Sequence, residues 1–338
     1  MIDSLTITNF KSFTDIDINL KSLSILTGLN SSGKSSVLQS LRILSNYQQR
    51  NIFILEEHGY AYELLNASRL INRFFEFQIK NEGNIYSLKI NTSKDDVASA
   101  ECYGALPIKC FYLSADRFGP KSILPLNMFD GATDVGEHGQ YVIDFLSRYG
   151  DEIIDSKLVH PKSEGSTLRY NVEAWLSEVA HGVKFRFNTD PLHSFSYSEY
   201  NNYRSTNVGF GLSYILPVIV CILGYRSLED SILLIENPEA HLHPKGQTAM
   251  GTLIALAASS GCQLIVETHS DHLIDGVRLA VKNGYVDESN CIINYFELLD
   301  NTSKCNEIFI DKKGKLSSWP EGFFDQNIIN KSLLVDLD

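Results

Sequence analysis

A phosphate-binding loop motif near the N-terminus constrains this chain more than any other feature. Residues 28–35 read G-L-N-S-S-G-K-S, which is the full G-x-x-x-x-G-K-S pattern. Glycines let successive backbone N–H groups turn towards phosphate oxygens, where a Cβ atom would block the approach. The pattern predicts a site for a nucleoside triphosphate and Mg²⁺, with Ser35 offering its hydroxyl to the metal. The residues expected to line the triphosphate are Asn30, Ser31, Ser32, Gly33, Lys34, Ser35 and Ser36.

The neighbours of the loop support this interpretation. Residues 23–27 alternate like a short strand, and residues 36–44 have the apolar spacing of a helix. The loop is therefore expected at a helix N-terminus, where the partial positive charge favours anions. The alternative, a Gly/Ser-rich turn that binds nothing, is far less common in this strand–loop–helix context.

Length and charge limit the classes of protein. A chain of 338 residues is expected to form one core with a sizeable insertion. Its net charge of −12 disfavours a surface that grips nucleic acid by general phosphate neutralisation. Any contact with nucleic acid is therefore expected to be local or supplied by a partner.

The remaining composition predicts a cytoplasmic protein. The six cysteines form no C-x-x-C pair and no metal-ligand spacing, which favours reduced thiols. The N-terminus alternates like a strand and has no export signal. The longest apolar run, residues 214–223, contains a proline and is too short to cross a membrane.

Hydrophobic periodicity predicts an α/β fold with a mixed or parallel sheet flanked by helices. Residues 1–60 and 196–338 are expected to form a composite head, with an inserted α+β lobe at 61–195. Strands are predicted at 5–10, 16–20, 23–27, 74–79, 85–90, 108–113, 231–235 and 263–266, and helices at 36–50, 140–149, 172–180, 213–226, 244–259 and 270–282.

Two predicted strands end in residues suited to nucleotide chemistry. Glu236 follows the apolar run 232–235, so it is expected at the carboxyl edge of the sheet as the acidic partner of Mg²⁺. His269 follows the strand at 263–266, where it is placed to sense a γ-phosphate. The alternatives are a solvent-facing acid and a structural histidine. The His-x-His pair at 241 and 243 could suggest a metal site, but no third ligand cluster lies near it in the sequence.

A second glycine-rich helix start lies at residues 207–217. Gly211 and Ser213 open an apolar helix there and could form another anion cradle. One nucleotide does not need two such cradles from the same face. We therefore expect Gly211 and Ser213 to contact the nucleotide of a second copy of the chain.

The order of these motifs resembles the ABC-type, P-loop ATPase heads of the RecF, chromosome-maintenance and overcoming-lysogenization-defect families. The segments that carry the resemblance are N-F-K-S-F at 9–13, the phosphate loop, G-F-G-L-S at 209–213, E-N-P-E-A-H-L-H-P at 236–244 and E-T-H-S at 267–270. The segment W-P-E-G-F-F-D at 319–325 resembles the ending of a stand-alone bacterial ATPase subgroup. The resemblance implies ATP and Mg²⁺ as cofactors and a head-to-tail homodimer.

The chain departs from those heads at the position expected for the catalytic base. Relatives carry a glutamate directly after the magnesium-associated acid, whereas this chain has Asn237. An amide cannot accept a proton from water, although it can orient the water. Either Glu239 supplies the carboxylate, Glu236 serves twice, or hydrolysis is slow. The usual glutamine that links Mg²⁺ to the lobe is not identifiable, and the segment 114–117 occupies the position expected for it.

Two functions remain in competition at this stage. The first is an ATPase switch that controls a separate effector, such as a nuclease, in bacterial defence against phage. It is favoured because only about seventy residues follow the last predicted ATPase strand, too few for an appended nuclease domain. The second is a RecF-like repair ATPase that clamps DNA directly, which the acidic charge disfavours. A transporter subunit is disfavoured because no L-S-G-G-Q helix start is present.

Overall fold

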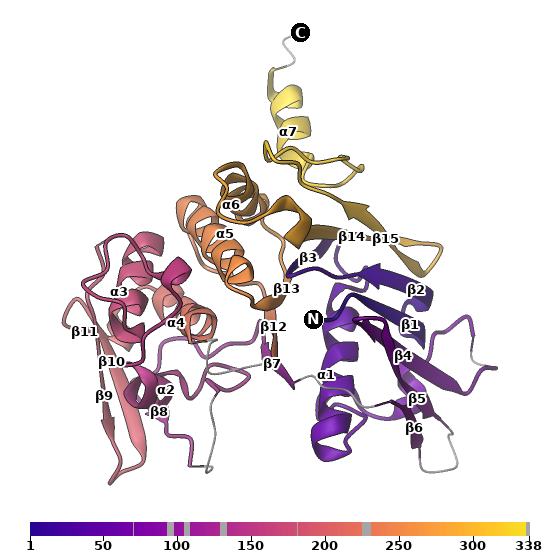
Figure 1. Cartoon of the computed structure of the whole chain (residues 1–338), viewed down its shortest axis with the longest axis horizontal. Coiled ribbons are helices and arrows are strands. Elements are labelled where there is room, and N and C mark those ends of the chain that lie inside the picture. The colour runs from indigo at the N-terminus through magenta and orange to yellow at the C-terminus, as the bar shows by residue number, and fades with distance from the viewer. Residues whose placement is uncertain are drawn as a thin grey trace. The chain divides into compact units, whose positions relative to one another are not determined.

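The computed structural model describes residues 1–69, 71–92, 98–104, 109–128, 134–180, 182–224 and 231–335. The chain forms two compact units. The colours of Figure 1 follow the residue number from the N-terminus to the C-terminus. The first unit combines residues 1–106 with 291–338, and the second comprises residues 107–290. The expected division into a head and a lobe at residues 61 and 195 stays a prediction.

An antiparallel sheet of five strands forms one layer of the first unit, in the order β2-β1-β4-β5-β6. Alternate side chains along its strands are buried, among them Leu5 and Ile7 of β1 and Phe75 and Phe77 of β4. This alternation arises because successive residues of a strand face opposite sides of the sheet. The strands are β1 (Ser4–Phe10), β2 (Phe13–Asn19), β4 (Phe74–Asn81), β5 (Asn84–Asn91) and β6 (Ser99–Tyr103).

The strand that precedes the phosphate loop pairs elsewhere in the first unit. β3 (Leu23–Gly28) runs parallel to β14 (Cys291–Leu299), which pairs antiparallel with β15 (Thr302–Ile308). The first five residues of β3 are buried, as expected for an apolar strand covered on both faces. The helical elements of this unit are α1 (Lys34–Arg50), η1 (Glu56–His58), η2 (Ala61–Leu64) and α7 (Gln326–Val335).

Three strands of the second unit pair in parallel. β12 (Ser231–Glu236) pairs with β7 (Lys109–Leu113) on one side and with β13 (Gln263–Glu267) on the other. Parallel neighbours need a crossover connection, which helix α5 (Pro244–Ser259) supplies between β12 and β13. The carboxyl ends of β12 and β13 therefore lie at the same edge.

Helices α5 and α6 (Asp271–Lys282) lie side by side in Figure 1 and approach each other closely. A Cβ atom added at Gly251 would lie 2.1 Å from the carbonyl oxygen of Leu273, and one at Gly276 would lie 2.2 Å from that of Thr248. Any larger residue at either glycine would force the helices apart. This tight packing fixes the start of α6, which directly follows the end of β13.

A second, smaller sheet completes the second unit. Strand β10 pairs antiparallel with β8, β9 and β11. The strands are β8 (Leu124–Pro125), β9 (Phe185–Asp190), β10 (Phe195–Tyr200) and β11 (Tyr203–Arg204). The accompanying helices are α2 (Val142–Tyr149), η3 (Ser156–Leu158), α3 (Leu168–Val179), η4 (Ser205–Asn207), α4 (Phe210–Leu223) and η6 (Glu288–Asn290).

The predicted elements are confirmed where they are described, with shifted ends. The strand expected from residue 16 begins at Phe13, and the helix expected from residue 213 begins at Phe210. Residues 108, 225 and 226, at the ends of two predicted elements, lie outside the described residues. Sequence reasoning missed β6, β8, β9, β10, β11, β14, β15 and α7.

The predictions drawn from composition are tested in part. All six cysteines are free thiols, and Cys221, Cys262 and Cys291 are buried. Within the described ranges, no helix combines the length and apolar character that crossing a bilayer requires.

Candidate functional site

Two glycines give the predicted phosphate loop its path between β3 and α1. Gly28 has φ 137° and Gly33 has φ 104°, a region that side chains with a Cβ atom rarely adopt. A Cβ atom at Gly28 would lie 2.0 Å from the carbonyl oxygen of Phe296 on the paired strand β14. At Gly33 it would lie 2.6 Å from the Phe13 ring. Both positions therefore require glycine for the loop to keep this shape.

Lys34 places its cation against the loop itself. The side chain is buried, and its Nζ donates hydrogen bonds to the carbonyl oxygens of Gly28 (3.1 Å) and Leu29 (2.8 Å). The Ser32 hydroxyl donates to the same Leu29 oxygen at 2.7 Å. A lysine ammonium held this way is a compact charge with three donors that can redirect to phosphate oxygens.

The start of α1 offers backbone donors to an anion. Its N-cap is Gly33, which has no side chain to cap the helix. Asn30 and Ser31 are exposed at the rim of the loop, and Ser31 adopts φ 60°. The first N–H groups of a 17-residue helix together with the Lys34 cation suit a chain of phosphates. The residues present therefore fit the triphosphate of ATP.

The predicted acid lies at the carboxyl end of β12, as expected. Glu236 is the last residue of that strand, and its Oε2 accepts a hydrogen bond from the backbone N–H of Ala115 at 3.1 Å. The next residue, Asn237, has φ 43°, and its N–H donates to the carbonyl oxygen of Glu267 at 2.8 Å. This bond joins the ends of β12 and β13.

Glu239 is buried beside those strand ends. It is 7% exposed, and its Oε1 accepts a hydrogen bond from the backbone N–H of His269 at 3.0 Å. Its Oε2 and the Oδ1 of Asn237 are buried atoms that find no hydrogen-bond partner among the described residues. Burial raises the pKa of the Glu239 carboxyl above its ordinary value. A buried carboxylate oxygen without a donor is the kind of group that can accept a proton from bound water.

Three of the predicted site residues of the second unit therefore come together. Glu236, Glu239 and His269 all lie at the ends of β12 and β13, and the His269 side chain is exposed. Their predicted roles at the γ-phosphate and Mg²⁺ stay predictions. Among the residues described, no three or more His, Cys, Asp or Glu side chains form a ready metal cluster.

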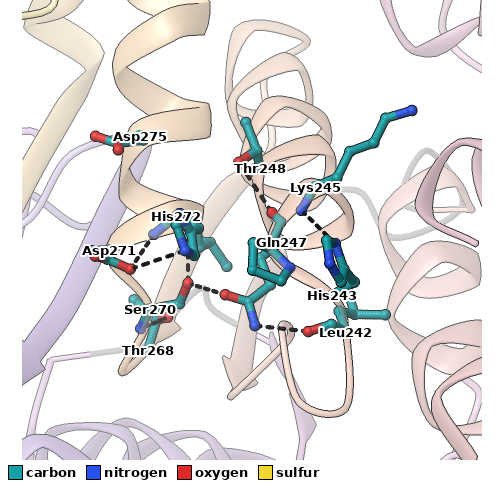
Figure 2. Close-up of polar contacts among 12 residues, drawn as sticks. Leu242, His243, Lys245, Gln247, Thr248, Thr268, Ser270, Asp271, His272 and Asp275 are labelled. Carbon is teal, nitrogen blue, oxygen red and sulfur yellow. Dashed lines mark hydrogen bonds and ion pairs between the residues drawn. The ribbon is translucent and has the colours of Figure 1, made fainter.

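Sequence reasoning missed a glutamine that braces this edge. Figure 2 shows Gln247 of α5 between the loop after β12 and the start of α6. Its Nε2 donates to the carbonyl oxygen of Leu242 at 2.9 Å, and its Oε1 accepts from the Ser270 hydroxyl at 2.6 Å. Ser270 in turn caps α6 by accepting from the N–H of Leu273 at 3.0 Å. The sequence signal that could have pointed to Gln247 is its place as a polar residue in the first turn of α5, directly after the motif loop at 236–244.

The second predicted cradle lies in the first turn of α4, which begins at Phe210 after the N-cap Gly209. A Cβ atom at Gly211 would lie 2.8 Å from the carbonyl oxygen of His241, so the helix start and the loop after β12 are in close contact. The Ser213 Oγ is buried in this arrangement. The contact of Gly211 and Ser213 with a second nucleotide stays a prediction.

A surface pocket opens beside this helix start. Its volume is about 440 Å³, and most of its lining is apolar. The lining includes Gly209, Gly211, His241, His243 and Lys245. Backbone glycines and basic side chains therefore share one hollow at the starts of α4 and α5.

Comparison with known families gives two matches. A model described as the AAA ATPase domain matches residues 1–123 and 139–274. A second model, described as a protein of unknown function (DUF3696), matches residues 286–333. No curated protein matches the chain.

Solved structures show the same fold at low identity. An SMC head bound to the C-winged helix domain of ScpA is 13% identical, with a TM-score of 0.58, and the match covers 92% of this chain and 98% of that one. An SMC head with an extended coiled coil, bound to the C-terminal domain of ScpA from Pyrococcus furiosus, is 13% identical, with a TM-score of 0.54 and coverage of 91% and 96%. The predicted fold, an α/β P-loop ATPase head, is confirmed by the likeness to SMC heads.

Proposed function

Because the chain belongs to the AAA ATPase domain family and is an ATPase, we propose that it works as a slow, ATP-dependent switch. It binds ATP with Mg²⁺ at the phosphate loop, pairs with a second copy in that state, and controls a separate effector. The observation that carries this proposal is the phosphate loop itself, with Gly28 and Gly33 at positive φ and Lys34 folded over the loop.

The residues divide the work as follows. Lys34 and the first N–H groups of α1 bind the phosphates, and Ser35 and Glu236 hold Mg²⁺. The metal supplies charge neutralisation on the phosphate oxygens. His269 contacts the γ-phosphate, for which its exposed position after β13 leaves room. Each role here is proposed from the position of the residue in its own unit and from the family.

Slow turnover is proposed because Asn237 replaces the usual base. Glu239 is the best candidate to accept the proton, since its Oε2 is buried without a hydrogen-bond partner in the described part of the chain. The Oε1 of Glu239 accepts a hydrogen bond from the backbone N–H of His269. Ionisation of Glu239 therefore also affects the loop that carries His269.

The pH dependence of turnover tests this assignment. A base must be ionised to act, and burial raises the pKa of Glu239. Turnover should therefore fall as the pH drops through a value above the ordinary glutamate pKa of about 4.3. We expect Glu239→Gln to remove most of the turnover. The fall in kcat at low pH should also disappear in a plot of kcat against pH. Full turnover in the variant would exclude Glu239 as the base.

ATP-dependent pairing is the second testable part of the proposal. The first turn of α4 and the pocket beside it present glycine backbone and basic side chains, which suit the phosphates of a second copy. We expect a non-hydrolysable ATP analogue with Mg²⁺ to double the mass in solution, measured by light scattering. The Lys34→Ala protein provides the control and should stay monomeric. A wild-type monomer at saturating analogue would contradict the proposal.

An effector is proposed because SMC heads of this fold are described in complex with ScpA domains, which are separate partner chains. The net charge of −12 favours control of a partner over direct gripping of DNA. We propose a nuclease or similar effector in bacterial defence against phage. Capture of a genetically linked partner with the ATP-bound dimer tests this; salt-sensitive DNA binding by the isolated protein would favour a DNA clamp instead.

A further inference from the structure

Arg117 is a buried cation that the functions above do not use. It follows β7 in the second unit and is 3% exposed. Burial lowers the pKa of Arg117 to about 10, so the guanidinium remains charged at neutral pH. A buried charge is costly unless its donors are satisfied by good hydrogen bonds. The partners of this side chain therefore have to be specific.

Those partners are backbone carbonyls from three separate segments. Nη1 donates to Glu236 at 2.6 Å and to Ser114 at 2.7 Å, and Nη2 donates to Asn237 at 2.7 Å. Nε donates to Tyr214 of α4 at 3.1 Å. One planar side chain thus joins the ends of β7 and β12 to helix α4.

Tyr214 strengthens the connection from the side of the helix. The guanidinium lies 4.4 Å from the centre of the Tyr214 ring, within the range of a cation–π interaction. The Tyr214 hydroxyl also donates to the carbonyl oxygen of Ala115. The N–H of that same Ala115 donates to the carboxylate of Glu236. Arg117 therefore binds the backbone of Glu236 directly. Tyr214 is connected to the Glu236 side chain through Ala115.

The fork of Arg117 also fixes an unfavourable backbone turn. Its two terminal nitrogens bind the successive carbonyls of Glu236 and Asn237, and Asn237 adopts φ 43°. That left-handed conformation costs free energy for a non-glycine residue and persists only where the surroundings hold it. A lysine has a single compact charge and cannot reproduce the planar fork.

We propose that Arg117 is a positioning residue that couples the acid at the end of β12 to the start of α4. Through this side chain, engagement of Glu236 in the ATP-bound state sets the position of the helix that faces a second copy. This role rests on the proposed function. It identifies Arg117 as the structural link between the bound nucleotide and the start of α4, which pairs with a second copy. The side chain touches neither ATP nor the reacting atoms in this role.

Arg117→Lys tests the coupling because it keeps the charge and removes the fork. The phosphate loop is unchanged, so affinity for an ATP analogue should stay within about threefold of wild type. Turnover and analogue-driven pairing should both fall by about tenfold or more, since small misplacements of catalytic groups carry large costs. Arg148→Lys is the matched control, because Arg148 also donates to a backbone carbonyl, that of Asn127, but lies on α2.

The wild-type protein is measured first, so that the two proposals fail separately. If the wild-type protein does not dimerise in the presence of the analogue, the proposed switch is wrong. If it dimerises and folded Arg117→Lys matches it in dimerisation and turnover, only the proposed role of Arg117 is wrong. A parallel loss of analogue affinity would also overturn the coupling. Should Arg117→Lys not fold, Tyr214→Phe serves instead: it keeps the ring beneath Arg117 and removes the bond to Ala115. It should lower turnover and pairing with unchanged affinity, and wild-type behaviour would refute the inference.

Discussion

Lys34→Ala should abolish ATP binding, with the affinity falling by about a hundredfold or more. The lysine ammonium is positioned within the loop by the carbonyls of Gly28 and Leu29, and nothing in an alanine side chain replaces its donors. Charge-assisted hydrogen bonds contribute about 1.5–3 kcal/mol each, and 1.4 kcal/mol corresponds to a factor of ten in affinity. Titration of a fluorescent ATP analogue in the presence of Mg²⁺ measures the effect.

The matched control is Lys80→Ala, which removes an exposed lysine from β4 in the same unit. Its affinity should equal that of wild type. Circular dichroism must establish that both variants are folded, because Lys34 is buried and its loss removes a donor from the carbonyl oxygens of Gly28 and Leu29. Retained affinity in folded Lys34→Ala would overturn the assignment of the nucleotide site.

Local sequence signals predicted the parts of the fold that position the site. The strand–loop–helix unit was predictable because β3 is a continuous apolar run, the glycines of the loop have few alternatives, and α1 has helical spacing. Glu236 and His269 were located by the same logic, since Glu236 ends one apolar strand and His269 lies two residues after the end of another. In these segments the spacing of the apolar residues and the sequence motif predict the same secondary structure.

Long-range pairing explains what the sequence did not predict. Strand β14 pairs with β3 across more than two thirds of the chain, and β9 and β10 are only six residues long, which makes strands of this kind hard to recognise from sequence alone. The contacts of Arg117 reach Tyr214 and Glu236, about a hundred residues further along the chain. The segment 114–117 could be marked as the replacement for a glutamine, but its hydrogen bonds only become visible in the folded unit.

Glu236→Gln should remove most ATP hydrolysis while ATP still binds. The amide keeps an oxygen that can accept the N–H of Ala115, so the end of β12 keeps its structure. It loses the negative charge proposed to hold Mg²⁺, and metal ions supply several kcal/mol of charge stabilisation in phosphoryl transfer. We expect kcat to fall by about a hundredfold or more, where 1.36 kcal/mol corresponds to a factor of ten in rate.

Phosphate release and analogue binding, measured on the same preparations, separate this effect from a loss of affinity. Glu164→Gln is the matched control, because Glu164 is an exposed glutamate of the same unit and its substitution should leave both quantities unchanged. Higher Mg²⁺ concentrations should restore part of the turnover of Glu236→Gln if the carboxylate acts through the metal. Turnover equal to wild type would show that Glu236 is not the acid of this site and would leave Glu239, whose pKa burial raises, as the proposed catalytic carboxylate.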